Sequence, residues 1–356
     1  MVIRFTPVDP AEALLHGPDR SVLRICAALP LTGVLGIMGP SSLEAVRLAY
    51  EESEESRSAS DRPVEIVLVD SGADAHHVAE QIAALVTAGG VEAIVGLHTS
   101  DTLRAVLASL GPHVVPYYFA PSYEDEVGGP MIRNVGESSA QTASQLAPVM
   151  AQTGARTWGI VGSDYLWGEC VGRRSRHVIE ERGGSVVLDV RCPLGAVRAS
   201  PGVIVDRIGR SGIDGVVLNL PASELLPVLR ELKHAGLDRT VVRYSGVLEE
   251  NVLYALGGDR TGGLFSGAFA FNSSQDGRRG EIRERLAASA DGPTPVLNAW
   301  SEHTYVGLRS AIDEERCGGS GPVDPMNGTG VVTGDTFGMA RRMRLGRADG
   351  LEFDAA

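Results

Sequence analysis

Little in this sequence supports catalysis, metal binding or membrane insertion. Aromatic residues make up only 5% of the 356 residues, and no run approaches the roughly 18 apolar residues of a membrane span. The motifs GxSxG, HExxH and GxxxxGK(S/T) are absent, as is GxGxxG after the first predicted strand. The four cysteines lack CxxC or metal-ligand spacing, which indicates reduced thiols. We therefore expect no enzyme, no metal and no cofactor.

The charge of the chain argues against nucleic acid and membrane partners. The formal net charge is -13 and the pI is about 5.1. The acidic residues are spread along the chain, so no basic surface for nucleic acid or anionic lipid is expected. The first 30 residues lack the basic start and apolar stretch of a secretion signal. We expect a cytoplasmic protein, or an extracytoplasmic one if a leader has been removed.

Short apolar runs alternate with amphipathic helical patterns, which is typical of βα units and a parallel sheet. The pattern occurs twice in succession, four units each time. Ser41 and Glu44 form a predicted capping box at the start of the first helix. The predicted strands are residues 22–29, 64–69, 93–96 and 114–119, then 158–161, 186–190, 215–220 and 241–244.

The repetition predicts an α/β fold with two doubly wound parallel-sheet lobes, a multi-strand hinge and a ligand cleft between the lobes. A helix over 296–315 is expected to complete the first lobe, and residues 317–330 read as a loop. A C-terminal hairpin with Gly350 near its turn is assigned to the second lobe. The expected lobes are residues 20–137 with 271–322, and residues 138–270 with 323–356.

Hydroxyl and aromatic residues follow the predicted strands at the ends where parallel sheets bind ligands. A Tyr or Trp contributes a large rigid surface with one polar group, and the N–H groups and hydroxyls of a helix start donate to a carbonyl or carboxylate oxygen. Together they predict a small neutral or zwitterionic pocket walled by aromatic rings. The candidate residues are His98, Thr99, Ser100, Phe119, Pro121, Ser122, Tyr123, Tyr165, Trp167, Pro221, Tyr244, Ser245 and Glu249.

Several stretches resemble the leucine/isoleucine/valine-binding group of type I periplasmic binding proteins. The opening "LPLTGVLGIMGPSSLEAVRLAYEE" is similar to that group's first βα unit. Within the group, "VGLHTSDTLRAV", "YYFAPSYEDE" and "GSDYLWGE" look most similar to the amide-sensing negative regulators of amidase operons. The resemblance implies that Ser100 bonds the ligand's carbonyl or carboxylate, and that Tyr165 and Trp167 close over the ligand.

Some positions depart from the family pattern. His98 and Phe119 replace tyrosines of the amide sensors, which implies a ligand other than acetamide. Transport members hold an amino acid's ammonium with a carboxylate where this chain has Ser245, with Glu249 nearby. An unpaired buried ammonium is costly, so a neutral ligand is favoured.

The resemblance implies non-catalytic binding of a short amide or related compound, with hinge closure, in a cytoplasmic sensor or regulator. Its partner would be an RNA-binding antiterminator, with no direct contact to nucleic acid and no membrane insertion. The alternative is the substrate-binding protein of an ABC transporter for branched-chain or other amino acids, amides or urea, which would dock on a permease. Both roles are compatible with a homodimer.

Overall fold

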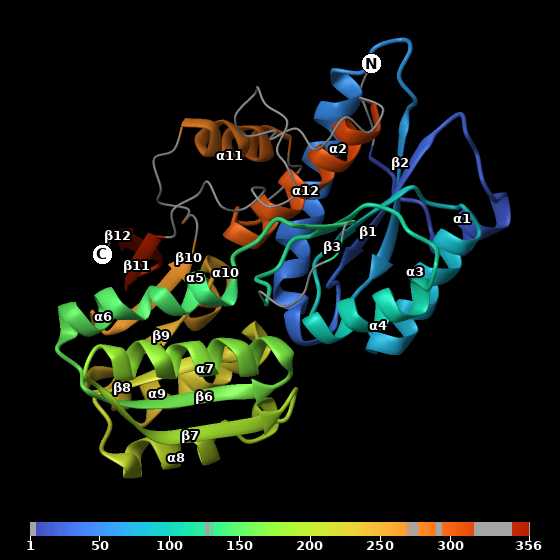
Figure 1. Cartoon of the computed structure of the whole chain (residues 1–356). Helices are drawn as coiled ribbons and strands as arrows, with labels where there is room; N and C mark the ends of the chain where they lie inside the picture. The colour runs from blue at the N-terminus through green and yellow to red at the C-terminus, as the bar shows by residue number, and fades with distance from the viewer. Residues whose placement is uncertain are drawn as a thin grey trace. The chain divides into compact units, whose positions relative to one another are not determined.

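The chain divides into two compact units. The computed structural model describes residues 5–124, 129, 131–268, 271, 277–289, 294–316 and 344–355. The first unit comprises Met1–Pro121, Val127–Gly136 and Gln275–Ala340, and the second comprises Ser122–Glu126, Glu137–Ser274 and Arg341–Ala356. Each unit is a sheet flanked by helices (Figure 1).

The first unit is built on a five-stranded parallel sheet in the order β2-β1-β3-β4-β5. Every residue of β1 is buried, as expected for a central strand covered on both faces. The strands are β1 (Leu23–Leu29), β2 (Val64–Asp70), β3 (Ala93–Gly96), β4 (Tyr117–Phe119) and β5 (Ile132–Asn134).

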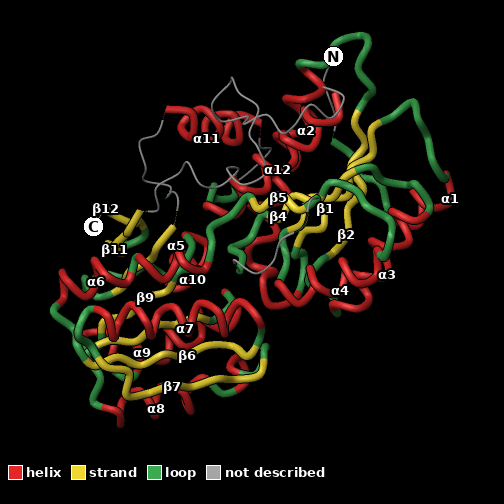
Figure 2. The backbone as a smooth tube through the Cα atoms, viewed as in Figure 1, coloured by secondary structure: helices red, strands yellow, loops and turns green. Residues whose placement is uncertain are grey.

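Helices from distant parts of the sequence cover this sheet (Figure 2). The hydroxyl of Tyr118 donates to Glu314, and Nη1 of Arg316 donates to the carbonyl of Ser53 over 3.0 Å. The predicted helix over 296–315 is thus found, and it packs on the first unit. The helices are α1 (Pro10–His16), η1 (Gly33–Met38), α2 (Gly39–Glu55), α3 (Ala75–Thr87), α4 (Ser100–Leu110), α11 (Gly277–Ser289) and α12 (Ala299–Arg316).

The second unit is built on a seven-stranded mixed sheet in the order β12-β11-β10-β9-β8-β6-β7. The last two strands form the predicted antiparallel hairpin, which pairs with β10. Gly350 at its turn has φ +65°, a conformation that favours glycine. The strands are β6 (Thr157–Asp164), β7 (Ser185–Pro193), β8 (Gly215–Asn219), β9 (Val242–Ser245), β10 (Leu264–Ala268), β11 (Arg344–Asp349) and β12 (Glu352–Ala355).

Helices α6 and α7 pack on this sheet around a buried cluster that includes Trp158, Val217, Tyr244 and Phe265. Helices α5, α6 and α7 contact one another, while α9 contacts α8 and α10. The helices are α5 (Ser139–Ser144), α6 (Leu146–Thr153), α7 (Leu166–Glu181), η2 (Val197–Ala199), α8 (Pro201–Ser211), α9 (Ala222–His234), η3 (Leu237–Arg239) and α10 (Glu250–Leu256).

The structure corrects two local predictions. The capping box at Ser41 and Glu44 is wrong, because η1 runs directly into α2, which begins at Gly39 without a side-chain cap. The strand predicted over 114–119 begins only at Tyr117, since Pro116 has no N–H for the ladder. The predicted loop over 317–330 lies outside the described residues, as does Cys317.

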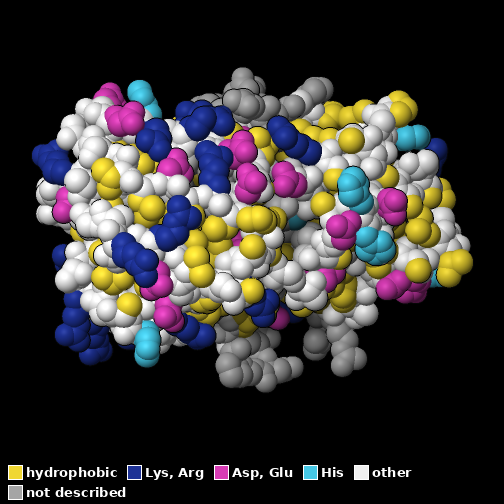
Figure 3. All heavy atoms as spheres, turned by 90° about the horizontal axis from the view of Figure 1, so that it is seen from below, with side chains coloured by type: hydrophobic (Ala, Val, Ile, Leu, Met, Phe, Trp, Pro, Cys, Tyr) yellow, Lys and Arg dark blue, Asp and Glu magenta, His cyan; other side chains and the backbone are white. Residues whose placement is uncertain are grey.

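Basic, acidic and apolar side chains are interspersed on the face drawn in Figure 3. No described helix is both long enough and apolar enough to span a bilayer. Among the described residues, no three His, Cys, Asp or Glu side chains are grouped as metal ligands.

Candidate functional site

In the first unit, the predicted hydroxyl residues lie where β3 leads into α4. Thr99 has extended backbone and is the N-cap of α4, where its side chain accepts a hydrogen bond from the N–H of Thr102. Ser100 is the first residue of the helix and is buried. This helix start places N–H groups and hydroxyls at the carboxyl end of the sheet, an arrangement that suits a carbonyl or carboxylate oxygen.

His98 has a different environment from that of its two neighbours. Its ring is buried, with Nε2 2.5 Å from the Tyr117 hydroxyl and Nδ1 3.0 Å from the Thr99 carbonyl oxygen. Burial disfavours the charged imidazolium and lowers the pKa of His98 to about 4. A Cβ at Gly96 would lie 2.6 Å from Nε2, so glycine there makes room for this pair. His98 is therefore a neutral core group with both ring nitrogens engaged.

Phe119 and Pro121 also lie in the interior of the first unit. Phe119 is fully buried, with its ring centroid 5.4 Å from that of His98. Pro121 is buried, and its carbonyl oxygen would be only 2.2 Å from a Cβ at Gly136. Both residues support the ends of β4 and β5, where the chain leaves the first sheet.

Asp70 is a structural group at these strand ends that the sequence analysis missed. Its carboxylate accepts hydrogen bonds from the backbone of Leu31 (2.9 Å), from the Thr32 hydroxyl (2.7 Å) and from the N–H of Gly72 (2.9 Å). Partial burial raises the pKa of Asp70, but these hydrogen bonds outweigh it and the net shift is downward. Asp70 thus fixes the "PLTG" turn after β1. In the sequence, the sign of this role is a single acidic residue directly after the predicted strand 64–69.

In the second unit, Tyr165 and Trp167 lie side by side at the start of α7, directly after β6. Tyr165 is the extended N-cap residue and is half-buried. The ring centroids are 6.2 Å apart with an interplanar angle of 32°. Trp167 is 3% exposed, and its indole Nε1 has no hydrogen-bond partner among the described residues. A buried donor in this state calls for a ligand or water that accepts from it.

Ser122 and Tyr123 lie beside the segment that leads into α5. The Ser122 hydroxyl donates to Glu137 Oε2 over 3.2 Å, and Tyr123 forms a backbone bridge with Ser138. Ser138 and Gln141 form a capping box at the start of α5. The chain entering the second unit is thereby held by both backbone and side-chain hydrogen bonds.

The remaining predicted residues follow β8 and β9. Pro221 is the N-cap residue of α9, and Glu249, 2% exposed, is that of α10. The Tyr244 hydroxyl donates to the carbonyl of Thr142 over 2.5 Å, and burial raises its pKa. Ser245 is buried, with its Oγ accepting from the N–H of Val247 over 3.4 Å. Tyr244 thus bonds within its own unit.

Glu224 joins three strand-end segments of the second unit, and the sequence analysis did not single it out. The side chain is fully buried on α9. Its Oε2 accepts from the Ser163 hydroxyl at 2.6 Å, and its Oε1 accepts from the N–H of Val197 at 2.9 Å. The end of β6, η2 and the start of α9 therefore hold one another in place. In the sequence, Glu224 looks like an ordinary acidic residue in the first turn of a helix.

The chain is similar to known periplasmic and solute-binding proteins. A family model described as periplasmic binding protein matches residues 22–313. A periplasmic binding protein from Burkholderia mallei aligns over 95% of this chain and 94% of its own, with 17% identity and a TM-score of 0.82. A solute-binding protein of an ABC transporter from R. palustris, solved with 4-hydroxybenzoate, aligns over 94% and 95%, with 22% identity and a TM-score of 0.76. A leucine-binding protein from Thermotoga maritima aligns over 94% and 98%, with 16% identity and a TM-score of 0.77.

Proposed function

Because the chain belongs to the periplasmic binding protein family, with the two-lobe α/β fold of its type I members, we propose that it binds a small organic solute without chemical change. The ligand contacts the strand-end loops, and the loaded protein delivers it to the permease of an ABC transporter. Relatives described as solute-binding proteins of ABC transporters favour this role over that of a cytoplasmic regulator.

The observation that carries the proposal is the buried indole N–H of Trp167. It lies beyond the carboxyl end of β6, beside the half-buried ring of Tyr165. Burying a donor without a partner costs about 1–3 kcal/mol, so an acceptor is expected to occupy the site in the working protein. A ligand with an oxygen acceptor and an apolar body meets both the N–H and the aromatic surface.

In the first unit, the groups at the start of α4 favour a carboxylate ligand. Thr99 and Ser100 place hydroxyls at a helix N-terminus, where the helix dipole favours negative charge. The nearby His98 is held neutral, so it adds no charge. Two of the similar structures are described with 4-hydroxybenzoate and as leucine-binding. We propose a small carboxylate with an aromatic or branched apolar body.

The test is isothermal titration of the full chain with 4-hydroxybenzoate, leucine, acetamide and urea. Trp167→Phe keeps a ring and removes the N–H, so affinity for the bound compound is expected to fall about 10- to 100-fold, the value of one hydrogen bond to a charged group. Trp158→Phe is the matched control, since its Nε1 donates to the Ala155 carbonyl within the core. Binding of neither carboxylate, or equal loss in both variants, would contradict the proposal.

The second candidate is a sensor of short amides. The uncharged hydroxyls at the start of α4 donate to an amide carbonyl as well as to a carboxylate. In the same titration, binding of acetamide or urea with no response to the carboxylates supports this candidate. Its partner would then be a regulator protein rather than a permease.

A further inference from the structure

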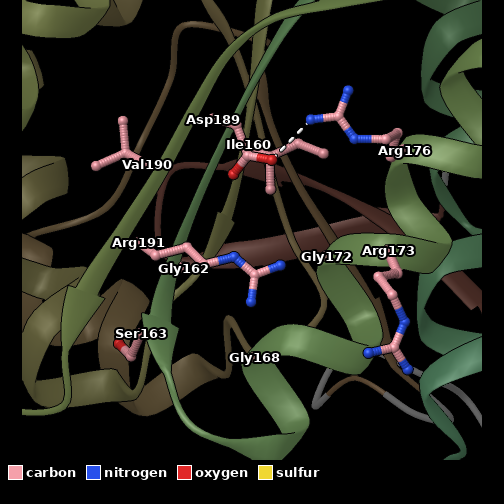
Figure 4. A pocket seen from close by; sticks show the side chains of 10 residues that line it. All are labelled: Ile160, Gly162, Ser163, Gly168, Gly172, Arg173, Arg176, Asp189, Val190 and Arg191. Carbon is pink, nitrogen blue, oxygen red and sulfur yellow. Dashed lines mark hydrogen bonds and ion pairs between the residues drawn. The ribbon is translucent and has the colours of Figure 1, made fainter.

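A small recess lies between α7 and the edge strand β7 of the second unit, and its lining includes Gly168, the residue after Trp167. Its volume is about 40 Å³, which is room for roughly three water-sized groups at about 10–15 Å³ each. Its lining includes Gly162, Gly172, Arg173, Arg176 and Arg191 (Figure 4).

Gly162 and Gly172 open the recess, and neither space nor backbone conformation requires glycine at these two positions. A Cβ at Gly172 would have its nearest neighbour at 3.9 Å, and one at Gly162 at 3.6 Å, which are ordinary contacts. Neither residue has a positive φ. Gly168 is different, because a Cβ there would lie 2.2 Å from the carbonyl oxygen of Ser163. The missing side chains at positions 162 and 172 therefore leave open space that alanine would fill.

A buried amide lies behind this open space. Asn219 ends β8 next to Gly162 in the sheet, and its side chain is fully buried. Its Nδ2 is 4.0 Å from the position of a Cβ on Gly172, so the amide points toward the helix residue that lines the recess. Neither Nδ2 nor Oδ1 has a hydrogen-bond partner among the described residues. A buried amide in this state needs a partner that both accepts and donates.

The charges around the recess favour an anion. Arg176 pairs with Asp189 at 2.7 Å, and Arg191 faces Glu169 at 3.6 Å. The Arg191 pair is half-exposed, and such pairs contribute little, so its guanidinium can exchange Glu169 for a ligand at small cost. Figure 4 shows Arg191 extending across the recess toward α7. The recess also adjoins the N-terminal half of α7, the positive end of the helix dipole.

We propose that this recess binds a small planar oxyanion, of the size of bicarbonate or acetate, between Arg191 and Asn219. The guanidinium of Arg191 neutralises the charge and donates to the outer oxygen. Nδ2 of Asn219 donates to the inner oxygen. Bicarbonate carries a hydroxyl that also donates to Oδ1, so it binds more tightly than acetate. The bound anion stabilises the packing of α7 on β6 and β7.

The test measures thermal unfolding of the full chain during titration with bicarbonate, acetate and chloride at constant ionic strength. The unfolding midpoint of the wild type is expected to rise more with bicarbonate and with acetate than with chloride. Gly172→Ala is expected to weaken the apparent affinity at least tenfold, because its methyl group fills the recess. Arg191→Gln is expected to have a similar effect. Gly202→Ala, the same change on α8, is the matched control, since its Cβ also meets nothing closer than 3.9 Å.

Two results would overturn the proposal. In one, bicarbonate and acetate act no differently from chloride on the wild type, which would mean that water alone fills the recess. In the other, bicarbonate and acetate raise the unfolding midpoint of Gly172→Ala as much as that of Gly202→Ala. A side-chain amide resonance of Asn219 that shifts with bicarbonate in the wild type but not in Gly172→Ala supports the assignment directly.

Discussion

The buried pair of His98 and Tyr117 makes the stability of the first unit depend on pH. The pKa of His98 is about 4 in the folded protein and 6.5 for the free side chain. Between these values the unfolded chain takes up a proton that the folded chain does not, so stability falls as the pH falls from 6.5 to 4. A difference of about 2.5 pKa units at about 1.36 kcal/mol each gives a loss of about 3 kcal/mol.

The assay is urea unfolding at several pH values between 7 and 4, for wild type and His98→Gln. The glutamine can reach toward Tyr117 but does not titrate. The stability advantage of wild type over this variant is expected to shrink by about 3 kcal/mol over that range. His113→Gln, the same change at an exposed position, is the control for the substitution itself. An unchanged difference for His98→Gln would refute the reasoning.

Two further predictions concern the second unit. Asp259→Ala removes the carboxylate that lies 2.8 Å from the buried guanidinium of Arg243, and it should lower the free energy of unfolding by about 3–5 kcal/mol. The control is Asp206→Ala in the exposed pair of Asp206 and Arg210, which should change the free energy of unfolding by less than about 0.5 kcal/mol. Gly168→Ala forces a Cβ against the Ser163 carbonyl and should lower the thermal midpoint, and a midpoint equal to that of Gly172→Ala would contradict the close approach.

The strands were predictable because buried parallel strands are continuous apolar runs. Residues 93–96 coincide with β3, and the other predicted strands of the two repeats overlap observed ones. β5 was missed, since Ile132–Asn134 is three partly exposed residues without an apolar run. The Ser41 prediction failed because a capping motif does not reveal a preceding 3₁₀ turn. Tertiary contacts, such as the fit of α2 against the end of β1 at Gly39, decided that start.

The candidate site was predictable only in part. Strand-end position follows from the order of elements, so residues such as Ser100 and Trp167 could be placed at the carboxyl ends of strands. The direction of a side chain does not follow from the order of the elements. His98 faces the core, where its Nε2 lies within hydrogen-bond distance of the Tyr117 hydroxyl. Glu224 and Asp70 were missed for the same reason, since their roles depend on backbone groups that are distant in sequence.

The packing of α12 on the first unit has a consequence for synthesis on the ribosome. The helix covers β3 and β4 and bonds Tyr118 and Ser53 through residues almost 200 or more positions later in the chain. During synthesis, this surface of the first sheet stays exposed until α12 has been made. Residues 137–268 of the second unit are made before that in one uninterrupted stretch, and they can already pack around Trp158. The unit that the ribosome begins first cannot be completed until all five parallel strands of the other have been made.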